Sequence, residues 1–141
     1  MQKTTLLSGI SLLFIGFSAG ASTCNAQQLE GSWSLDYAKY TNKQGQLVGE
    51  IKGGSTLSRK LLIDGVVHFI TWQPNGEVTV SASGQYRVER GRYIETVEVS
   101  TYAGIKGKVF DFQCRIENGT WIHFGPENDL FIEEHWIKIS K

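Results

Sequence analysis

The sequence predicts an all-β domain, folded as an eight-stranded antiparallel up-and-down β-barrel. Three observations predict it. Apolar and polar residues alternate with period two from Gly31 to Ile139, turn signals separate the alternating runs, and no long window carries a 3.6-residue apolar stripe. Consecutive hairpins form a meander, and eight such strands can close into a barrel that holds packed side chains or one small ligand. Closure also removes exposed strand edges.

Eight alternating runs are the expected strands. Their ranges are 31–39, 56–63, 66–73, 77–89 with a kink near Gly84, 92–100, 107–117, 120–125 and 130–139. Asp64-Gly65 and Asn118-Gly119 suit two-residue hairpins, because both turn positions need positive φ. Pro74-Asn75-Gly76 suits a three-residue loop, and Arg90-Gly91 separates two further runs. Residues 40–55 are a polar, Gly-rich link, either a plain loop or a lid over one barrel mouth.

Residues 1–26 are predicted to be a signal peptide, and residues 27–141 the barrel domain. Lys3 precedes the apolar run Leu6–Phe17, and small residues follow it. The run is shorter than the about 20 apolar residues that a spanning helix needs. We therefore expect a secreted or periplasmic protein without a membrane span.

The two cysteines leave three possibilities open. Cleavage after Ala26 would leave Cys114 as a single thiol, whereas cleavage after Ala21 would retain both cysteines and allow a disulfide. Alternatively, Cys24 is the lipid anchor of an outer-membrane lipoprotein, although residues 21–23 match the lipid-attachment motif poorly.

Composition and motifs argue against several functional classes. The chain has 14 basic and 14 acidic residues, so a basic surface for nucleic acid is not expected. No glycine loop leads from a strand into a helix to cradle phosphate, and no His-Glu-x-x-His zinc motif is present. Cys114 facing His123 suits packing better than nucleophilic catalysis. We expect no cofactor, no metal and no enzymatic activity; catalysis by Glu95 or a histidine is the least favoured alternative.

Turn geometry predicts which side chains share the barrel interior. The Asp64-Gly65 turn pairs Leu57 with Trp72, Arg59 with Ile70, Leu61 with His68 and Ile63 with Val66, and because this face is mostly apolar we expect it to be the interior one. The same parity continues across the next loop, which pairs Trp72 with Val78, Ile70 with Val80 and His68 with Ala82, and then to Gly84, Tyr86, Val88, Tyr93, Glu95, Val97 and Val99. Further along the chain, the predicted interior residues are Phe110, Phe112, Cys114, Ile116, Trp121 and His123. In the last strand the face with Leu130, Ile132, Glu134 and Trp136 is taken as interior, and the alternative is the face with Phe131, Glu133, His135, Ile137 and Ile139.

This register places polar groups inside the barrel. A buried charge must pair, reach a mouth or meet a ligand. We expect Tyr86 and Glu95 to meet across one hairpin, and the tryptophans to form aromatic walls. The predicted ligand-binding residues are Arg59, His68, Trp72, Tyr86, Tyr93, Glu95, His123, Glu134 and Trp136. The alternative is that these charges form structural ion pairs in a solid core.

Leu29-Glu30-Gly31-Ser32-Trp33 resembles the Gly-x-Trp signature that opens lipocalins and other members of the calycin superfamily. The chain is also similar to small secreted bacterial lipocalin-like domains at residues 69–72, 83–86 and 92–95. The resemblance implies that Lys138 packs over Trp33 by a cation–π contact. The chain is shorter than larger lipocalins and lacks their Thr-Asp-Tyr motif and usual disulfides, so the resemblance does not extend to a transport role.

The sequence and the resemblance together predict a secreted lipocalin-like binding protein. Its partner would be a small hydrophobic or amphipathic ligand held in the barrel. The alternative is a solid-packed barrel that acts as a protein-interaction or inhibitor module. A cavity inside the barrel distinguishes the two.

Overall fold

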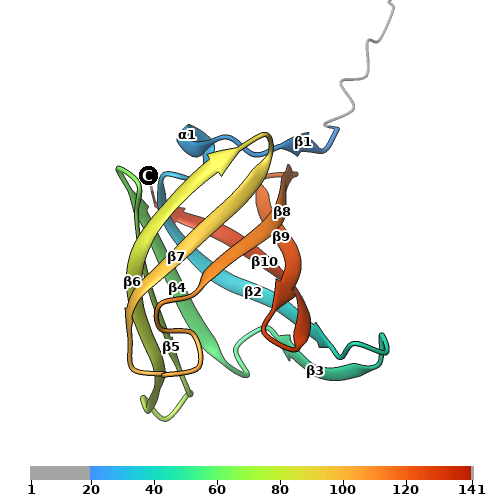
Figure 1. Ribbon diagram of the computed structural model, residues 1–141, viewed down its shortest axis with the longest axis vertical. Helices are drawn as coiled ribbons and strands as arrows, with labels where there is room; N and C mark the ends of the chain where they lie inside the picture. The colour runs from blue at the N-terminus through green and yellow to red at the C-terminus, as the bar shows by residue number, and fades with distance from the viewer. Residues whose placement is uncertain (1–19, 141) are drawn as a thin grey trace, which may run out of the picture.

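A computed structural model describes residues 20–140 of the chain, and strands dominate it (Figure 1). The elements are β1 (Ser22–Thr23), α1 (Ala26–Leu29), β2 (Gly31–Thr41), β3 (Leu47–Lys52), β4 (Leu57–Ile63), β5 (Val66–Trp72), β6 (Val78–Glu89), β7 (Arg92–Ser100), β8 (Val109–Glu117), β9 (Thr120–Glu127) and β10 (Leu130–Ser140). Residues 1–19, which hold most of the predicted leader, lie outside the described residues.

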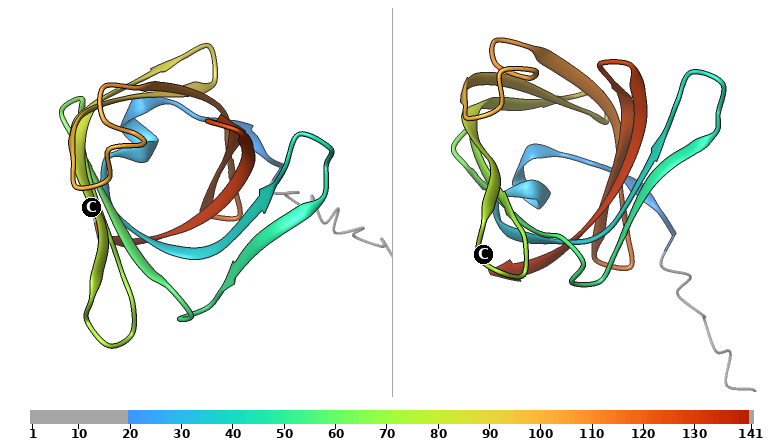
Figure 2. Two further views of the ribbon diagram at one scale, coloured as in Figure 1. Left: turned by 60° about the horizontal axis from the view of Figure 1, so that its bottom comes forward. Right: turned by 90° about the horizontal axis from the view of Figure 1, so that it is seen from below.

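Eight strands close into an antiparallel barrel, as the sequence predicts. The order around the barrel is β2, β4, β5, β6, β7, β8, β9 and β10, and β10 pairs with β2 to complete the ring. Figure 2 shows this ring from one end. Apart from the excursion into β3, each strand lies beside the next one in the sequence, which is the up-and-down topology.

The predicted hairpin turns form where the sequence places them. Asp64, Arg90 and Asn118 have φ values of 48°, 52° and 51°, and each is followed by a glycine with positive φ. Two consecutive positive φ values match the right-handed twist of the flanking strands. The β4–β5, β6–β7 and β8–β9 hairpins therefore follow directly from local sequence.

The interior face predicted for β4 and β5 is wrong, because the β5–β6 pairing contains a bulge. The predicted β4–β5 register is correct, with Leu57 opposite Trp72. The register then shifts between Thr71 and Trp72, so that Ile70 faces Ser81. A one-residue slip moves every side chain of a strand to the other face. The inward residues of β4 are consequently Ser58, Lys60 and Leu62.

A second irregularity bends β6 at the predicted kink. The β6–β7 register shifts between Ser83 and Gly84. A Cβ on Gly84 would lie 1.8 Å from the carbonyl oxygen of Thr96, so only glycine permits this approach. Beyond the shift, Val99 is exposed on the outer wall instead of facing inward as predicted.

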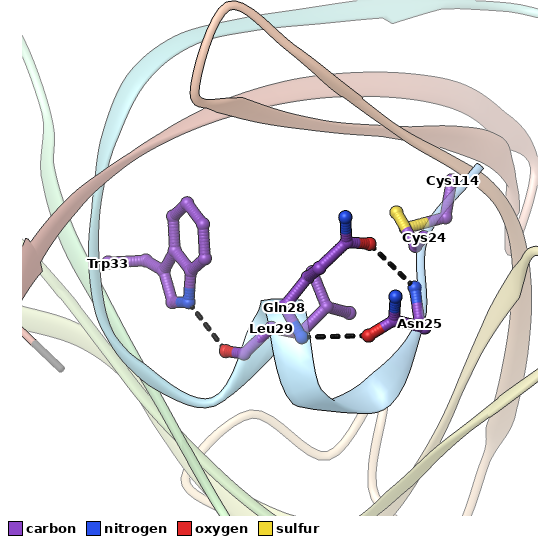
Figure 3. The surroundings of a disulfide bond; sticks show 6 residues. All are labelled: Cys24, Asn25, Gln28, Leu29, Trp33 and Cys114. Atoms are coloured by element: carbon purple, nitrogen blue, oxygen red, sulfur yellow. Dashed lines mark hydrogen bonds between the residues drawn. A yellow bond between two sulfur atoms is a disulfide. The ribbon is translucent and has the colours of Figure 1, made fainter. Parts of the chain in front are cut away.

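The N-terminal segment closes one end of the barrel. Helix α1 starts with a capping box between Asn25 and Gln28. Cys24, just before it, forms a disulfide with Cys114 on β8 (Figure 3). Leu29 is fully buried, and its carbonyl oxygen accepts a 2.8 Å hydrogen bond from the Trp33 indole. A chain that began at residue 27 would lack both β1 and this disulfide.

Lys138 lies over Trp33, as the resemblance implies. Its Nζ is 4.9 Å from the centre of the indole ring and donates a 3.0 Å hydrogen bond to the carbonyl oxygen of Gln28. The last strand, the first strand of the barrel and α1 are thereby joined at the closed end.

Residues 40–55 are a hairpin and not a lid. The second half of β2 pairs with β3 as well as with β10, from Tyr37 to Thr41. Figure 2 shows this β2–β3 hairpin pointing away from the ring. The barrel mouth opposite α1 is therefore not covered by it.

Candidate functional site

A cavity of about 240 Å³ occupies the half of the barrel opposite α1. Its wall includes residues at the mouth ends of the strands, such as Tyr40 at the end of β2, Val80 near the start of β6 and Glu127 at the end of β9. The full lining is Tyr40, Ser58, Lys60, Phe69, Thr71, Val80, Glu95, Tyr102, Ile105, Phe110, Phe112, His123, Glu127, Ile132, Glu134 and Trp136. This combination of aromatic walls and a few polar groups is typical of small-molecule sites.

The other half of the barrel is packed with aromatic side chains. Trp33 contacts Trp121 edge-to-face with ring centres 5.4 Å apart, and Tyr93 contacts Trp121 in the same way at 5.0 Å. All three residues are almost completely buried. The barrel is thus solid near α1 and hollow near its mouth.

A buried ion pair forms the floor of the cavity. The ammonium of Lys60 lies 3.2 Å from Oε2 of Glu95, and the hydroxyl of Tyr93 donates a 2.6 Å hydrogen bond to the same oxygen. Both charged side chains are about 95% buried. Such a pair is costly to desolvate and costlier to break, because one charge would remain buried alone. Burial, with Glu95 beside the hydroxyl, raises the pKa of Tyr93, so it remains a hydrogen-bond donor.

Aromatic rings surround the Lys60 ammonium. Its Nζ lies 5.0 Å from the centre of the Trp136 ring and 5.3 Å from that of Phe69. The rings of Tyr93 and Trp121 are each 5.5 Å away. Distances below about 6 Å are typical of cation–π contacts, which gain strength when water is excluded.

A second polar cluster joins β9 and β10. Nε2 of His123 is 2.9 Å from Oε2 of Glu134, and the Trp136 indole donates a 3.0 Å hydrogen bond to that oxygen. Both ring nitrogens of His123 are buried, and neither has a partner with hydrogen-bond geometry within residues 20–140. The contact between His123 and Glu134 is therefore close in distance but lacks the geometry of a hydrogen bond. The His123 ring stacks on Phe112 at 4.8 Å.

The electrostatics favour an ionised Glu134 beside a neutral His123. Burial lowers the pKa of His123, and together with the neighbouring Lys60 charge it outweighs Glu134 and Glu95, which act to raise that pKa. Burial alone would raise the pKa of Glu134, but the adjacent His123 ring, the Lys60 charge and the Trp136 N–H lower it below its ordinary value of 4.5. Near neutral pH the cluster therefore carries a negative charge.

Glu127 is the least compensated group of the cavity. Its side chain is half-buried and makes no hydrogen bond or ion pair with any residue from 20 to 140. Burial, with a smaller contribution from the charge of Glu134, raises its pKa from 4.5 to about 7. The Glu127 carboxyl therefore changes its protonation state within the physiological pH range.

Some predicted site residues do meet in the cavity. Glu95, His123, Glu134 and Trp136 line it. Tyr93 lies just beneath and donates to Glu95.

Tyr86 has a different partner from the one predicted. It is opposite Glu95 in the ladder, but its hydroxyl donates a 2.5 Å hydrogen bond to Glu30 at the closed end.

Three other predicted site residues do not face the interior. Arg59 and His68 are exposed on the outer wall, and the guanidinium of Arg59 lies 6.0 Å from the ring centre of the half-buried Trp72. The predicted inward orientation of Arg59, His68 and Trp72 is therefore wrong. The cause is the bulge at Thr71, which exchanged the two faces of β4 and β5.

Sequence reasoning missed Lys60 and Glu127. Lys60 lies on the β4 face that the predicted register placed outside, and Glu127 lies in β9 beyond the predicted end of that strand at residue 125. The alternation of β4 gives no warning, because Leu57, Leu61 and Ile63 make its outer face look like an interior one.

The comparisons with known proteins do not identify the chain. No family model, curated protein or solved structure matches it. Within residues 20–140 no group of three or more His, Cys, Asp or Glu side chains is arranged to hold a metal ion. The same part of the chain contains no helix with the length and apolar character of a membrane span. The geometry of the cavity therefore carries the functional argument.

Proposed function

We propose that this chain is a binding protein that holds one small, partly apolar molecule in the mouth half of its barrel. The observation that carries this proposal is the cavity itself, about 240 Å³ with aromatic walls and a polar floor. A solid-packed interior would have favoured the alternative of a pure interaction module. The volume lies slightly below the ~300–1,000 Å³ of typical drug-sized sites, which suits a small ligand.

A relationship to lipocalins is part of the proposal. Gly31-Ser32-Trp33 opens the first barrel strand, and Lys138 from the last strand covers the Trp33 ring at 4.9 Å. The up-and-down order of the eight strands is compatible with that family. These features support a barrel architecture shared with lipocalins. They do not specify the ligand, because a fold does not determine what its members bind.

We further propose a secreted or periplasmic location with cleavage after Ala21. This site retains Cys24 and its disulfide to Cys114, whereas cleavage after Ala26 removes it. Disulfides persist in oxidising compartments. A disulfide-bonded Cys24 has no free sulfur for a lipid thioether, which favours a protein without that anchor.

A second candidate function is protein interaction through the outer wall. Apolar side chains of β4, β5 and β10 are exposed there, on strands that neighbour one another through β2: Leu61, Ile63, Val66, Ile137 and Ile139. Size-exclusion chromatography with light scattering of wild type and of Ile63→Asp tests one such interaction, self-association. A wild-type dimer that the substitution dissociates would support this candidate, and two monomers would leave the cavity as the functional feature.

Titration with N-phenyl-1-naphthylamine, whose aryl nitrogen is uncharged at pH 7, tests the binding function. Its fluorescence should rise on entering the cavity of the wild-type protein. Val80→Phe places a ring in the cavity and should abolish the rise. Val78→Phe, on the exposed side of the same strand, is the matched control and should bind normally. Equal binding by all three proteins would contradict the proposal.

A further inference from the structure

The cavity contains more acidic than basic groups. Three carboxylates line it, from Glu95, Glu127 and Glu134, against one lysine, Lys60. His123 also lines the cavity, but burial lowers its pKa, so that it is neutral near pH 7. Lys60 is already committed to Glu95 at 3.2 Å. Negative charge therefore remains uncompensated in a partly desolvated space, where charge interactions are stronger than in water.

The buried carboxylates have acceptor capacity left over. Glu95 is 4% exposed, and its Oε2 accepts from both Lys60 and Tyr93, whereas its Oε1 accepts no hydrogen bond from residues 20–140. Glu134 likewise uses only Oε2, toward His123 and Trp136. Within residues 20–140 neither Oε1 atom is a fully buried atom without a partner, so both are open to the cavity and can accept a hydrogen bond from a donor that a ligand brings.

The relevant oxygens belong to adjacent strands. In the β9–β10 ladder Glu134 is opposite His123 and Ile132 is opposite Gly125, so Glu127 lies nearer the mouth and Glu134 deeper on the same wall. Trp136 and Phe110 supply aromatic faces in the same cavity. Carboxylates combined with aromatic faces are the chemistry that binds organic cations.

We propose that the ligand is an organic amine that enters as its ammonium form, with the cation between Glu127 and Glu134 and an apolar body against Phe69, Ile105 and Ile132. This inference rests on the proposed function and specifies its ligand class. A neutral ligand would leave the carboxylates uncompensated, and an anionic one would add to the negative charge.

Binding of such a cation is coupled to the protonation of Glu127. The charged groups that act on Glu127 are Glu134 from β10, Lys60 from β4, Glu95 from β7 and Lys108 from the segment before β8, and the charge of Glu127 in turn acts on the phenol of Tyr40 from β2. Lys108 is itself hydrogen-bonded to Asn128. Since an ammonium favours the ionised carboxylate, the amine affinity rises as the pH increases through about 7, and binding near that pH releases protons.

Calorimetric titration with three probes of similar size tests the ligand class: 2-phenylethylamine, 2-phenylethanol and phenylacetate. At pH 7.5 we expect the amine to bind at least about tenfold more tightly than the alcohol, and phenylacetate to bind most weakly; tenfold corresponds to about 1.4 kcal/mol. Equal or tighter binding of the alcohol or of phenylacetate would overturn the amine assignment. It would leave the binding function intact provided that N-phenyl-1-naphthylamine still binds. If that probe and all three ligands fail to bind, both proposals fall.

Two variants locate the effect. Glu127→Gln should reduce the amine affinity several-fold and leave the alcohol affinity unchanged, because Glu127 makes no hydrogen bond or ion pair with residues 20–140 that would be lost. Glu89→Gln removes an exposed carboxylate at the closed end and serves as the control. An unchanged amine-to-alcohol ratio in Glu127→Gln would overturn the placement of the cation.

Discussion

Glu127 shows how a single side chain couples the cavity to pH. Burial disfavours its ionised form and raises its pKa to about 7, above the ordinary 4.5. A carboxyl with a raised pKa stabilises the folded state while it is protonated. This contribution is complete below about pH 4.5 and is lost as the pH rises through 7.

Glu127→Gln should therefore stabilise the protein at alkaline pH. We expect its free energy of unfolding to exceed that of wild type by about 1–3 kcal/mol at pH 8.5, with the difference shrinking toward pH 4.5. Urea unfolding at several pH values measures it. Glu89→Gln, on the exposed surface, should follow the wild-type curve, and a pH-independent gain in Glu127→Gln would refute the electrostatic explanation.

The Lys60–Glu95 pair makes a second prediction at the residue scale. Lys60→Met leaves Glu95 buried without its cation and should cost about 3–5 kcal/mol. Adding Glu95→Gln to that variant removes the unpaired charge and should recover most of the loss. A double-mutant cycle from urea unfolding measures the coupling. Additive effects of the two substitutions would show that the contact at 3.2 Å contributes nothing.

At the scale of elements, local chemistry predicts the strands and turns. It does not predict the bulges, and these decide which side chains of a strand face the barrel interior. Alternation and Gly-containing turns locate all eight barrel strands, because both features act within a few residues. The bulge at Thr71 has no such signature, since it depends on how β5 and β6 fit together in the closed ring. Because the prediction did not include this one-residue bulge, it placed Arg59 and His68 inside the barrel and Lys60 outside, whereas the structure has the reverse.

The second bulge can be tested through Gly84. Gly84→Ala would push a Cβ to within 1.8 Å of the Thr96 carbonyl oxygen, so β6 and β7 must separate locally. We expect a loss of more than about 3 kcal/mol, at the upper end for single substitutions. Gly49→Ala, whose Cβ would meet only the Tyr40 side chain at 3.5 Å, is the matched control. Similar melting temperatures for the two variants would contradict the close approach at Gly84.

The short N-terminal elements were also missed by sequence reasoning. Helix α1 has four residues and β1 has two, both too short to produce a periodic pattern. Their position depends on the Cys24–Cys114 disulfide and on the burial of Leu29 beneath the barrel. The sequence left this disulfide as one of three alternatives, since pairing requires knowledge of distance.

For the whole molecule, the barrel divides its interior between stability and binding. Tryptophans and tyrosines fill the half next to α1, and their burial supplies the hydrophobic stabilisation that a small domain needs. The mouth half remains hollow and holds charges that solid packing would not tolerate. The sequence predicted the closed barrel and four cavity residues, Glu95, His123, Glu134 and Trp136, because the β7–β8, β8–β9 and β9–β10 pairings that place them contain no register shift.

Native mass spectrometry of the protein purified from the organism that makes it tests the central claim most directly. We predict that the wild-type chain and Val78→Phe retain one equivalent of a small molecule, and that Val80→Phe, with its cavity filled, does not. Retention by Val80→Phe at the wild-type level, or no bound mass on any of the three proteins, would contradict a ligand-binding cavity.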